Sequence, residues 1–221
     1  PFVAVKDVNF GVYDKELVSL VGPSGCGKST ILRMLGGILR PTSGIISYYD
    51  KTYKDGVSVE ARKKIGFVFQ AHNLLPWRTV RQNLHLPLEV LNLSGGDWNA
   101  RIDELLDMVG LLEFADAYPL ELSVGMQQRV GIVRALVHDP QILLMDEPFA
   151  SLDAISREQM NLELLSLWMK TKKTIVFITH NVDEAVLLSS RIFVMAANPG
   201  RIVKEIQVDL PMPRTLATLN C

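Results

Sequence analysis

The chain has 221 residues, of which 48% are hydrophobic, so it can bury a core as one large domain or as one domain with an insertion. Its net charge of −1 excludes a global basic field that would recruit nucleic acid or an anionic membrane. We expect no membrane span, because no apolar run approaches the ~18 residues that one needs, and no secretory signal. Two cysteines, Cys26 and Cys221, do not make a disulfide framework and suit a reducing cytosol.

The first part of the chain predicts strands that lead into a helix. Residues 8–12 alternate between apolar and small or polar side chains, which is typical of a half-buried strand. The apolar run Leu17–Val21 predicts a buried strand, and a helix is expected from about Lys28 to Leu39, where residues 41–44 would end it. We expect residues 1–5 to lie in the middle of a sheet, so the chain resembles one whose N-terminal end is truncated.

The loop between that strand and that helix carries the strongest motif of the chain. It is a phosphate-binding P-loop in its expected context, formed by Gly22, Pro23, Ser24, Gly25, Cys26, Gly27, Lys28, Ser29 and Thr30. Glycines let backbone N–H groups converge on an anion without Cβ clashes, and the helix N-terminus adds partial positive charge. Lys28 is expected to reach the β- and γ-phosphates of a nucleotide, and Ser29 to ligate Mg²⁺.

The middle of the chain is expected to be a helical insertion between strand-rich parts. Two strands are predicted first, at about Ile45–Tyr49 and Ile65–Phe69. The pattern then becomes helical from about Asn73, with apolar residues at i, i+3, i+4 and i+7. The expected helices are Asn83–Leu93, Ala100–Leu112 and Ser123–Val137.

Strands and helices alternate in the last third of the chain. The expected strands are Ile142–Met145, Thr174–Thr179, Arg191–Met195 and Ile202–Val208, and the expected helices are Ile155–Lys170 and Asp183–Leu188. Such alternation is typical of an α/β fold with a mainly parallel sheet. The predicted fold class is therefore an α/β P-loop NTPase with a mainly parallel core sheet, an N-terminal antiparallel β portion and a helical insertion.

Two carboxylates follow the apolar strand that ends at Met145. Because four apolar residues precede the pair, we expect Asp146 at the carboxyl end of a buried strand, beside the P-loop, where it would hold Mg²⁺. Glu147, one residue on, is expected to act as the general base that polarises an attacking water. A solvated acidic loop is the alternative interpretation, which the upstream P-loop disfavours.

Other nucleotide-binding classes fit less well. The chain has no Asn-Lys-x-Asp segment of the kind that GTPases use to read the base, and no compact Arg cluster for a kinase lid. The glycine spacing around Gly25 and Gly27 does not fit the G-x-G-x-x-G fingerprint of dinucleotide-binding folds. No metal-ligand spacing links the four histidines, and Arg129 and Arg134 are interpreted as structural helix residues.

Four further segments complete a family pattern. Gln70 follows the strand Ile65–Phe69, Leu122–Arg129 reads Leu-Ser-Val-Gly-Met-Gln-Gln-Arg, Ser151-Leu152-Asp153 follows the acidic pair, and His180 follows the strand Thr174–Thr179. Together with the P-loop and Asp146-Glu147, these segments resemble the ATP-binding subunit of an ABC transporter. The resemblance covers nearly the whole chain, in order.

The resemblance implies a role for each of these residues. Gln70 would contact Mg²⁺ or the attacking water, and His180 would hold the γ-phosphate and position Glu147. Ser123 and the amide of Gly125 would contact the γ-phosphate of a second subunit, and Asp153 would couple the two sites. ATP and Mg²⁺ would bind residues 22–30, Gln70, Asp146, Ser123, Gly125 and Asp153, with Ser29, Gln70 and Asp146 as the metal ligands. The catalytic residues would be Lys28, Gln70, Glu147 and His180.

The resemblance also implies domain organisation and partners. Residues 1–221 would form a single ATPase domain, with an ATP-binding core at 1–72 and 138–221 and a helical subdomain at 73–137 that carries the signature segment. The expected partners are transmembrane permease subunits, a second ATPase subunit (identical or a close paralogue) and a solute-binding protein, with no nucleic acid. The chain is expected on the cytoplasmic face of the cell membrane.

Two positions depart from the family pattern. Val124 stands where the signature usually has its first glycine, and a β-branched residue cannot adopt a positive φ cheaply. If that backbone is helical, valine is tolerable there but would crowd the nucleotide, so we expect Val124→Gly to raise ATPase activity.

The second departure concerns the adenine, which the family usually stacks on an aromatic residue upstream of the first strand. Phe2 is one candidate for this role, and the alternative is that Phe2 is a packed sheet residue. Tyr13 lies on the wrong side of the strand pattern for this role.

A partner surface and a cargo class are suggested near Gln70. Leu74, Leu75 and Trp77 form either a groove for a helix of another protein or ordinary core of the insertion. Residues 75–80, 199–203 and 209–211 resemble the nitrate, sulfonate and taurine importer group. The predicted function is ATP hydrolysis that powers transport of such a solute. The alternatives are a regulatory nucleotide-binding module with weak hydrolysis, which Val124 keeps open, and a non-transport ABC ATPase.

Overall fold

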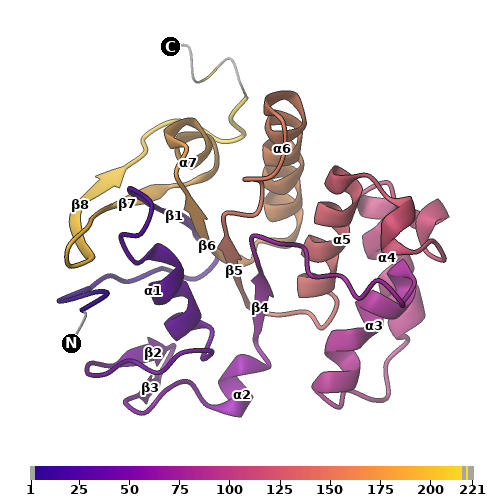
Figure 1. Cartoon of the computed structure of the whole chain (residues 1–221), viewed down its shortest axis with the longest axis horizontal. Helices are drawn as coiled ribbons and strands as arrows, with labels where there is room; N and C mark the ends of the chain where they lie inside the picture. The colour runs from indigo at the N-terminus through magenta and orange to yellow at the C-terminus, as the bar shows by residue number, and fades with distance from the viewer. Residues whose placement is uncertain (1–2, 216–217, 219–221) are drawn as a thin grey trace.

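A six-stranded sheet crosses the middle of the protein in the computed structural model, which describes residues 3–215 and 218 (Figure 1). The strand order is β4-β5-β6-β1-β7-β8, and all neighbours are parallel except β7 and β8. The strands are β1 (Leu17–Val21), β4 (Ile65–Val68), β5 (Ile142–Asp146), β6 (Thr174–Thr179), β7 (Arg191–Ala196) and β8 (Arg201–Gln207). The predicted α/β fold with a mainly parallel sheet is confirmed.

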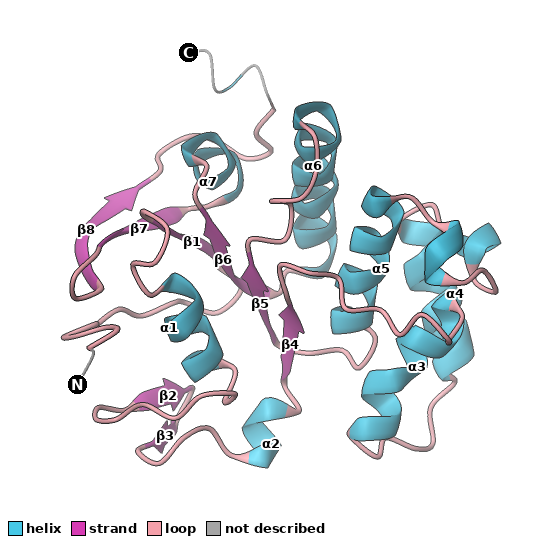
Figure 2. Cartoon of the chain, in the orientation of Figure 1, coloured by secondary structure: helices cyan, strands magenta, loops and turns pink. Residues whose placement is uncertain are grey.

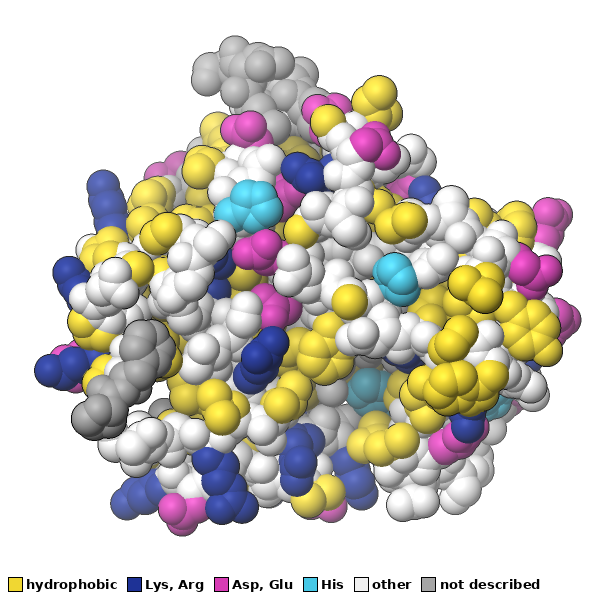
Figure 3. Space-filling view, in the orientation of Figure 1, with side chains coloured by type: hydrophobic (Ala, Val, Ile, Leu, Met, Phe, Trp, Pro, Cys, Tyr) yellow, Lys and Arg dark blue, Asp and Glu magenta, His cyan; other side chains and the backbone are white. Residues whose placement is uncertain are grey.

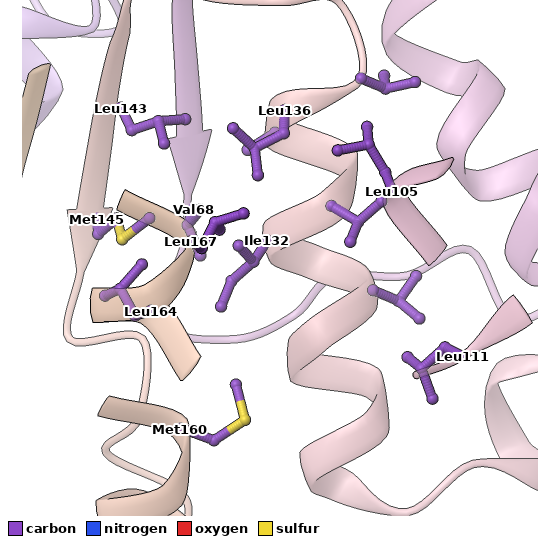
Figure 4. Close-up of a cluster of buried hydrophobic side chains, with 14 of the residues drawn as sticks. Val68, Leu105, Leu111, Ile132, Leu136, Leu143, Met145, Met160, Leu164 and Leu167 are labelled. Carbon is purple, nitrogen blue, oxygen red and sulfur yellow. The ribbon is translucent and has the colours of Figure 1, made fainter. Parts of the chain in front are cut away.

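The central strands are apolar along their length because both of their faces are buried. In β5, Leu143 and Met145 belong to the cluster beneath α5 and α6, whereas Ile142 and Leu144 belong to the cluster beneath α1. Each buried Leu or Ile contributes roughly 1.5–3 kcal/mol to folding. Figure 4 shows Leu143 and Met145 grouped with the α5 and α6 side chains Ile132, Leu136, Met160, Leu164 and Leu167.

Helices cover both faces of the sheet and gather at one end of the molecule (Figure 2). They are α1 (Lys28–Leu35), α2 (Val59–Arg62), α3 (Val80–Val90), α4 (Trp98–Met108), α5 (Val124–Leu136), α6 (Ala154–Thr171) and α7 (Val182–Leu188), with short 3₁₀ turns at Leu112–Phe114 and Pro119–Glu121. The helices α3, α4 and α5 contact one another beyond β4.

Polar caps explain where most of these helices begin. The side chains of Thr79, Ser123, Asp153 and Asn181 each accept a backbone N–H of the first turn. The capping box between Thr79 and Gln82 starts α3 at Val80, three residues before the predicted start at Asn83. The structure ends α1 at Leu35 rather than near Leu39, because Gly37 adopts a left-handed φ of 68° and closes the helix.

The predicted strand at residues 8–12 is wrong. Val8, Phe10 and Val12 do face the cluster beneath α1, which explains the alternation of the sequence. The segment nevertheless has no strand partner among the described residues, so alternate burial there does not report sheet pairing. The antiparallel portion near the N-terminal end is instead the hairpin β2 (Ile46–Tyr48) and β3 (Lys51–Tyr53). Neither β3 nor α2 was predicted.

No helix in residues 3–215 combines the length and the apolar character that crossing a membrane would need.

Arg191 ties the segment before β1 to the sheet. Its guanidinium donates to both carboxylate oxygens of Glu16 (2.7 and 2.6 Å), to Glu205 (2.8 Å) and to the carbonyl of Gly11 (2.9 Å). The ring of Tyr13 lies 4.7 Å from the guanidinium carbon. Burial alone would raise the pKa of Glu16, but hydrogen bonds from Arg191, the Tyr13 N–H and Ser190 hold this pKa below its ordinary value.

We expect Glu16→Gln to lower the free energy of unfolding at pH 7 by about 1–3 kcal/mol, since a charge-assisted pair is lost. Because the folded pKa of Glu16 is depressed, its stabilisation is present above the unfolded pKa of 4.5 and is lost as the pH falls through the lower folded value. Urea unfolding of wild type and variant should therefore differ at pH 7 and converge in acid. Glu205→Gln is the control, because that side chain is half exposed. Equal stabilities of the Glu16 variant and wild type at pH 7 would refute the role of the pair.

Candidate nucleotide-binding site

The loop after β1 is shaped to present backbone N–H groups. Gly25 and Gly27 adopt left-handed φ values of 77° and 96°, which residues with a Cβ rarely adopt. Gly27 is also the N-cap of α1, and no side chain caps that helix. The first N–H groups of α1 therefore remain available to an anion at the helix N-terminus.

The ammonium of Lys28 lies inside this loop. Nζ donates to the carbonyls of Gly22 (2.8 Å) and Pro23 (3.2 Å), and the residue is only 5% exposed. The carboxylate oxygen Oε1 of Glu147 lies 3.8 Å from Nζ. The loop carbonyls thus hold a buried positive charge beside the position that a bound phosphate would take.

Ser29 and Asp146 form the second part of the site. Asp146 ends β5, and its Oδ1 accepts a hydrogen bond of 2.8 Å from the Ser29 hydroxyl. Burial raises the pKa of Asp146, and the hydrogen bond from Ser29 offsets part of that effect. Two adjacent oxygen ligands fit Mg²⁺, which keeps waters and takes substrate phosphates as its other ligands. Within residues 3–215, no group of three or more His, Cys, Asp or Glu side chains would hold a metal by itself.

Glu147 and His180 meet across two neighbouring strands. β5 and β6 pair in parallel, so the residues that follow them lie at the same edge of the sheet. His180 Nδ1 lies 3.1 Å from Glu147 Oε2, and the Glu147 N–H donates to the carbonyl of Ile178 (3.1 Å). Glu147 has a left-handed φ of 45°, a backbone state that costs on the order of 1 kcal/mol or more in a non-glycine residue.

Gln70 lies at the same edge but is not in contact with these groups. It is exposed and follows β4 by two residues, and β4 pairs in register with β5 (Val68 with Met145). The segment after Gln70 is fixed by Arg134 of α5, which donates to the carbonyls of His72 (2.7 Å) and Asn73 (2.8 Å). The sequence alone indicates only that Arg134 lies on a helix, because no local pattern predicts a contact across 62 residues of chain.

Ser123, Gly125 and Asp153 lie apart from the P-loop. The Ser123 hydroxyl caps α5 by accepting the Met126 N–H (3.3 Å), and Asp153 caps α6 by accepting the Ser156 N–H (3.0 Å). Hydrogen bonding from Ser156 lowers the pKa of the exposed Asp153 carboxyl. Among the described residues, neither Ser123 nor Asp153 has a hydrogen bond to the P-loop.

Val124 is the first residue of α5, with helical backbone and a half-exposed side chain. The backbone at this position therefore does not demand glycine. The possible adenine-stacking residue Phe2 lies outside the described residues. Tyr13 is 73% exposed and stacks on Arg191.

Charged and histidine side chains lie close together near the centre of the face shown in Figure 3. At the site itself, the His180 side chain is 53% exposed and that of Glu147 is 19% exposed. A ligand can therefore reach the outer part of the site from solvent.

The fold and the loop around Lys28 are those of a P-loop NTPase, and the comparisons give its family. Residues 5–150 match the family described as ABC transporter. The chain belongs to the ABC transporter family and is an ATPase of that family, as the motifs predicted.

Relatives match almost the entire chain. An uncharacterized ABC transporter ATP-binding protein of Methanocaldococcus jannaschii is 48% identical over 221 residues, covering 98% of this chain and 79% of the relative. A taurine import ATP-binding protein of Jannaschia sp. is 44% identical (93% and 75% covered), and an aliphatic sulfonates import ATP-binding protein of Bacillus cereus is 42% identical (96% and 81% covered).

Solved structures support the same family assignment. The ABC transporter cassette MJ0796, solved as a dimer, is 36% identical with a TM-score of 0.82, covering 94% of this chain and 92% of that chain. The same cassette in a post-hydrolysis state, bound to ADP and Pi, matches equally well.

We expect Lys28→Met to weaken ATP binding by about 10–100-fold, since a charge-assisted contact to phosphate is lost. Lys64→Met is the matched control, because Lys64 is exposed and lies outside the site. Both variants should be titrated with ATP after thermal melts have shown that they are folded. Equal affinity of the Lys28 variant and wild type would contradict the assignment.

We also expect Val124→Gly to raise ATPase turnover, because the branched side chain beside the Gly125 amide is removed while the backbone stays helical. Turnover of variant and wild type, measured side by side, checks this expectation. Unchanged or lower turnover would contradict the expectation that the Val124 side chain crowds a nucleotide bound near Gly125.

Proposed function

We propose that the chain is the ATP-hydrolysing subunit that powers import of a small solute through a membrane permease. The observation that carries the proposal is the cluster of Lys28, Glu147 and His180 at the edge of the sheet, with Nζ–Oε1 and Nδ1–Oε2 distances of 3.8 and 3.1 Å. A cation for phosphate thus lies next to a carboxylate that can accept a proton from water.

The P-loop would bind the triphosphate. Its backbone N–H groups and Lys28 would hold the β- and γ-phosphates, and Ser29, Asp146 and Gln70 would hold Mg²⁺. The ion, when bound, supplies charge neutralisation on the transferred phosphoryl group. The Ser29–Asp146 hydrogen bond of 2.8 Å supports this role, because it places two hard oxygen ligands together.

Glu147 and His180 would carry out the hydrolytic step. Glu147 accepts the proton of a water that attacks the γ-phosphorus, the bond to the ADP oxygen breaks, and the products are ADP and phosphate. His180, 3.1 Å from Glu147, orients that carboxylate and contacts the γ-phosphate. Most of the acceleration comes from electrostatic positioning by Lys28 and the loop.

A second copy of the chain or a close paralogue would complete each site. Ser123 and Gly125 lie at the N-terminus of α5, a second place where N–H groups favour an anion. Asp153, the exposed N-cap of α6, would couple the two sites. Support comes from MJ0796, which was solved as a dimer. We propose that ATP closes two cassettes head to tail and that hydrolysis reopens them.

The chain would consist of two parts with different roles. We propose an ATP-binding core at residues 1–72 and 138–221 and a helical subdomain at residues 73–137. The mutual contacts of α3, α4 and α5 support this division. The subdomain carries Ser123 and Gly125 and so would present them to the partner's nucleotide.

A permease would dock beside the segment that follows Gln70. Trp77 is 71% exposed there, Leu74 and Leu75 are partly buried, and Asn83 hydrogen-bonds the N–H (2.8 Å) and carbonyl (3.1 Å) of Leu75. The surface is therefore rigid and apolar, as a groove for a partner helix requires. This docking would place the chain at the cytoplasmic face of the membrane. Permease subunits that co-purify with the chain from native membranes would identify the transporter.

The cargo class follows from the relatives. Because the Jannaschia and Bacillus proteins are named for taurine and aliphatic sulfonate import, we propose a small anion such as nitrate or a sulfonate. A solute-binding protein and the permease would select it.

The central test is Glu147→Gln, which removes the proton acceptor but keeps the size of the side chain. We expect ATP binding to remain and turnover to fall by about 10²–10⁴-fold, because the general base is lost. An ATP-dependent dimer should accumulate, because the closed dimer reopens only after ATP is hydrolysed. Glu158→Gln, on the exposed face of α6, is the control. Phosphate release and size-exclusion chromatography with ATP provide the measurements. Normal turnover of the Glu147 variant would remove Glu147 from its role.

A further inference from the structure

Arg157 of α6 holds the loop that leads from β5 to α6. Its Nε donates to the carbonyl of Phe149 (3.3 Å) and its Nη2 donates to the carbonyl of Leu152 (2.8 Å). The side chain is 25% exposed and lies one turn after Asp153, which caps the same helix. A single guanidinium thus fixes two carbonyls on either side of Ser151, just before the exposed Asp153.

Glu184 of α7 holds a different turn, the one that carries His180. The Thr179 hydroxyl donates to Glu184 Oε2, and the same hydroxyl accepts the N–H of Asn181 (2.9 Å). The residues on both sides of His180 are therefore fixed through the Glu184 carboxylate. Glu184 is 7% exposed, so its charge needs a nearby cation.

That cation is Arg157. Its Nε lies 3.7 Å from Glu184 Oε1, the oxygen that Thr179 does not use. Both residues line one small pocket together with Glu147, Ala150, Thr179 and His180. The loop before α6 and the turn before α7 are thus joined through one ion pair between two helices, which also contact each other.

We propose that the Arg157–Glu184 pair is a positioning device that keeps the Asp153 loop and the His180 turn in one fixed relation. The proposal rests on the proposed function, in which Asp153 reaches a second cassette and His180 orients Glu147. Closure of the dimer at Asp153 is then transmitted to the hydrolytic pair, and hydrolysis starts only when the partner is in place. Neither residue touches the nucleotide; each acts through the backbone that it holds.

The test compares steady-state ATP hydrolysis, ATP affinity and thermal melting of the full chain carrying Arg157→Ala, Arg157→Lys or Glu184→Gln. We expect Arg157→Ala to lower kcat by at least about tenfold, since small misplacements of catalytic groups are costly, while the dissociation constant for ATP stays within about twofold. Arg157→Lys should recover part of kcat, because an ammonium still faces Glu184 but cannot hold both carbonyls. Glu184→Gln keeps the side-chain size and decides the question if Arg157→Ala does not fold.

A double-mutant cycle separates positioning from general damage. If Arg157 acts through His180, then Arg157→Ala combined with His180→Ala will be no more than about twofold slower than the slower single variant in single-turnover hydrolysis. Effects that multiply would overturn the proposal. Arg81→Ala is the matched control, because Arg81 makes an ion pair of 2.7 Å with Asp103 between two helices and has similar exposure, and its kcat should stay at the wild-type value.

The outcomes also separate this inference from the proposed function. If the unmodified protein does not hydrolyse ATP, the proposed function is wrong and the inference falls with it. If the unmodified protein hydrolyses ATP and both Arg157→Ala and Glu184→Gln keep its kcat, the proposed function stands and the inference alone is wrong.

Discussion

The buried ammonium of Lys28 is the charge around which the rest of the site is arranged. A cation that is 5% exposed must be solvated by the protein, and the carbonyls of Gly22 and Pro23 and the carboxylate of Glu147 do this. That arrangement requires a loop that turns tightly at glycines, a strand that brings Glu147 alongside, and a sheet rigid enough to hold both. The proposed phosphate binding and water activation would therefore both depend on this one cluster of charges.

The parallel strands explain why segments that are distant in the sequence lie together around Lys28. Because β1, β5 and β6 run in the same direction, the P-loop, the acidic pair and His180 all emerge at one edge. Both faces of these strands are buried, so the register that places Glu147 3.1 Å from His180 is fixed by packing on two sides. In the proposed function, Ser123 and Gly125 at the start of α5 would bind the γ-phosphate of a second copy, so one chain alone would form an incomplete site.

The elements that could be predicted from the sequence are those whose apolar pattern can be recognised within the segment itself. The apolar strands Leu17–Val21 and Thr174–Thr179 were predicted with their observed bounds, because burial on both faces leaves a plain apolar run. Residues 8–12 were wrongly predicted as a strand, because alternation of apolar and polar residues indicates burial of one face and not pairing with another strand. The hairpin strand β3 was not predicted, because Lys51–Tyr53 is mostly exposed and has no apolar pattern. The contacts of Arg134 and the Arg157–Glu184 pair depend on tertiary structure, since their partners are remote or belong to another helix.

We expect the turn around Lys28 to bind a nucleoside triphosphate. Titration calorimetry of the purified protein with ATP and magnesium tests it most directly. The expected result is saturable binding of one ATP per chain. A protein that melts cooperatively, and is therefore folded, yet shows no heat of binding and no protection of its melting temperature by ATP would contradict it.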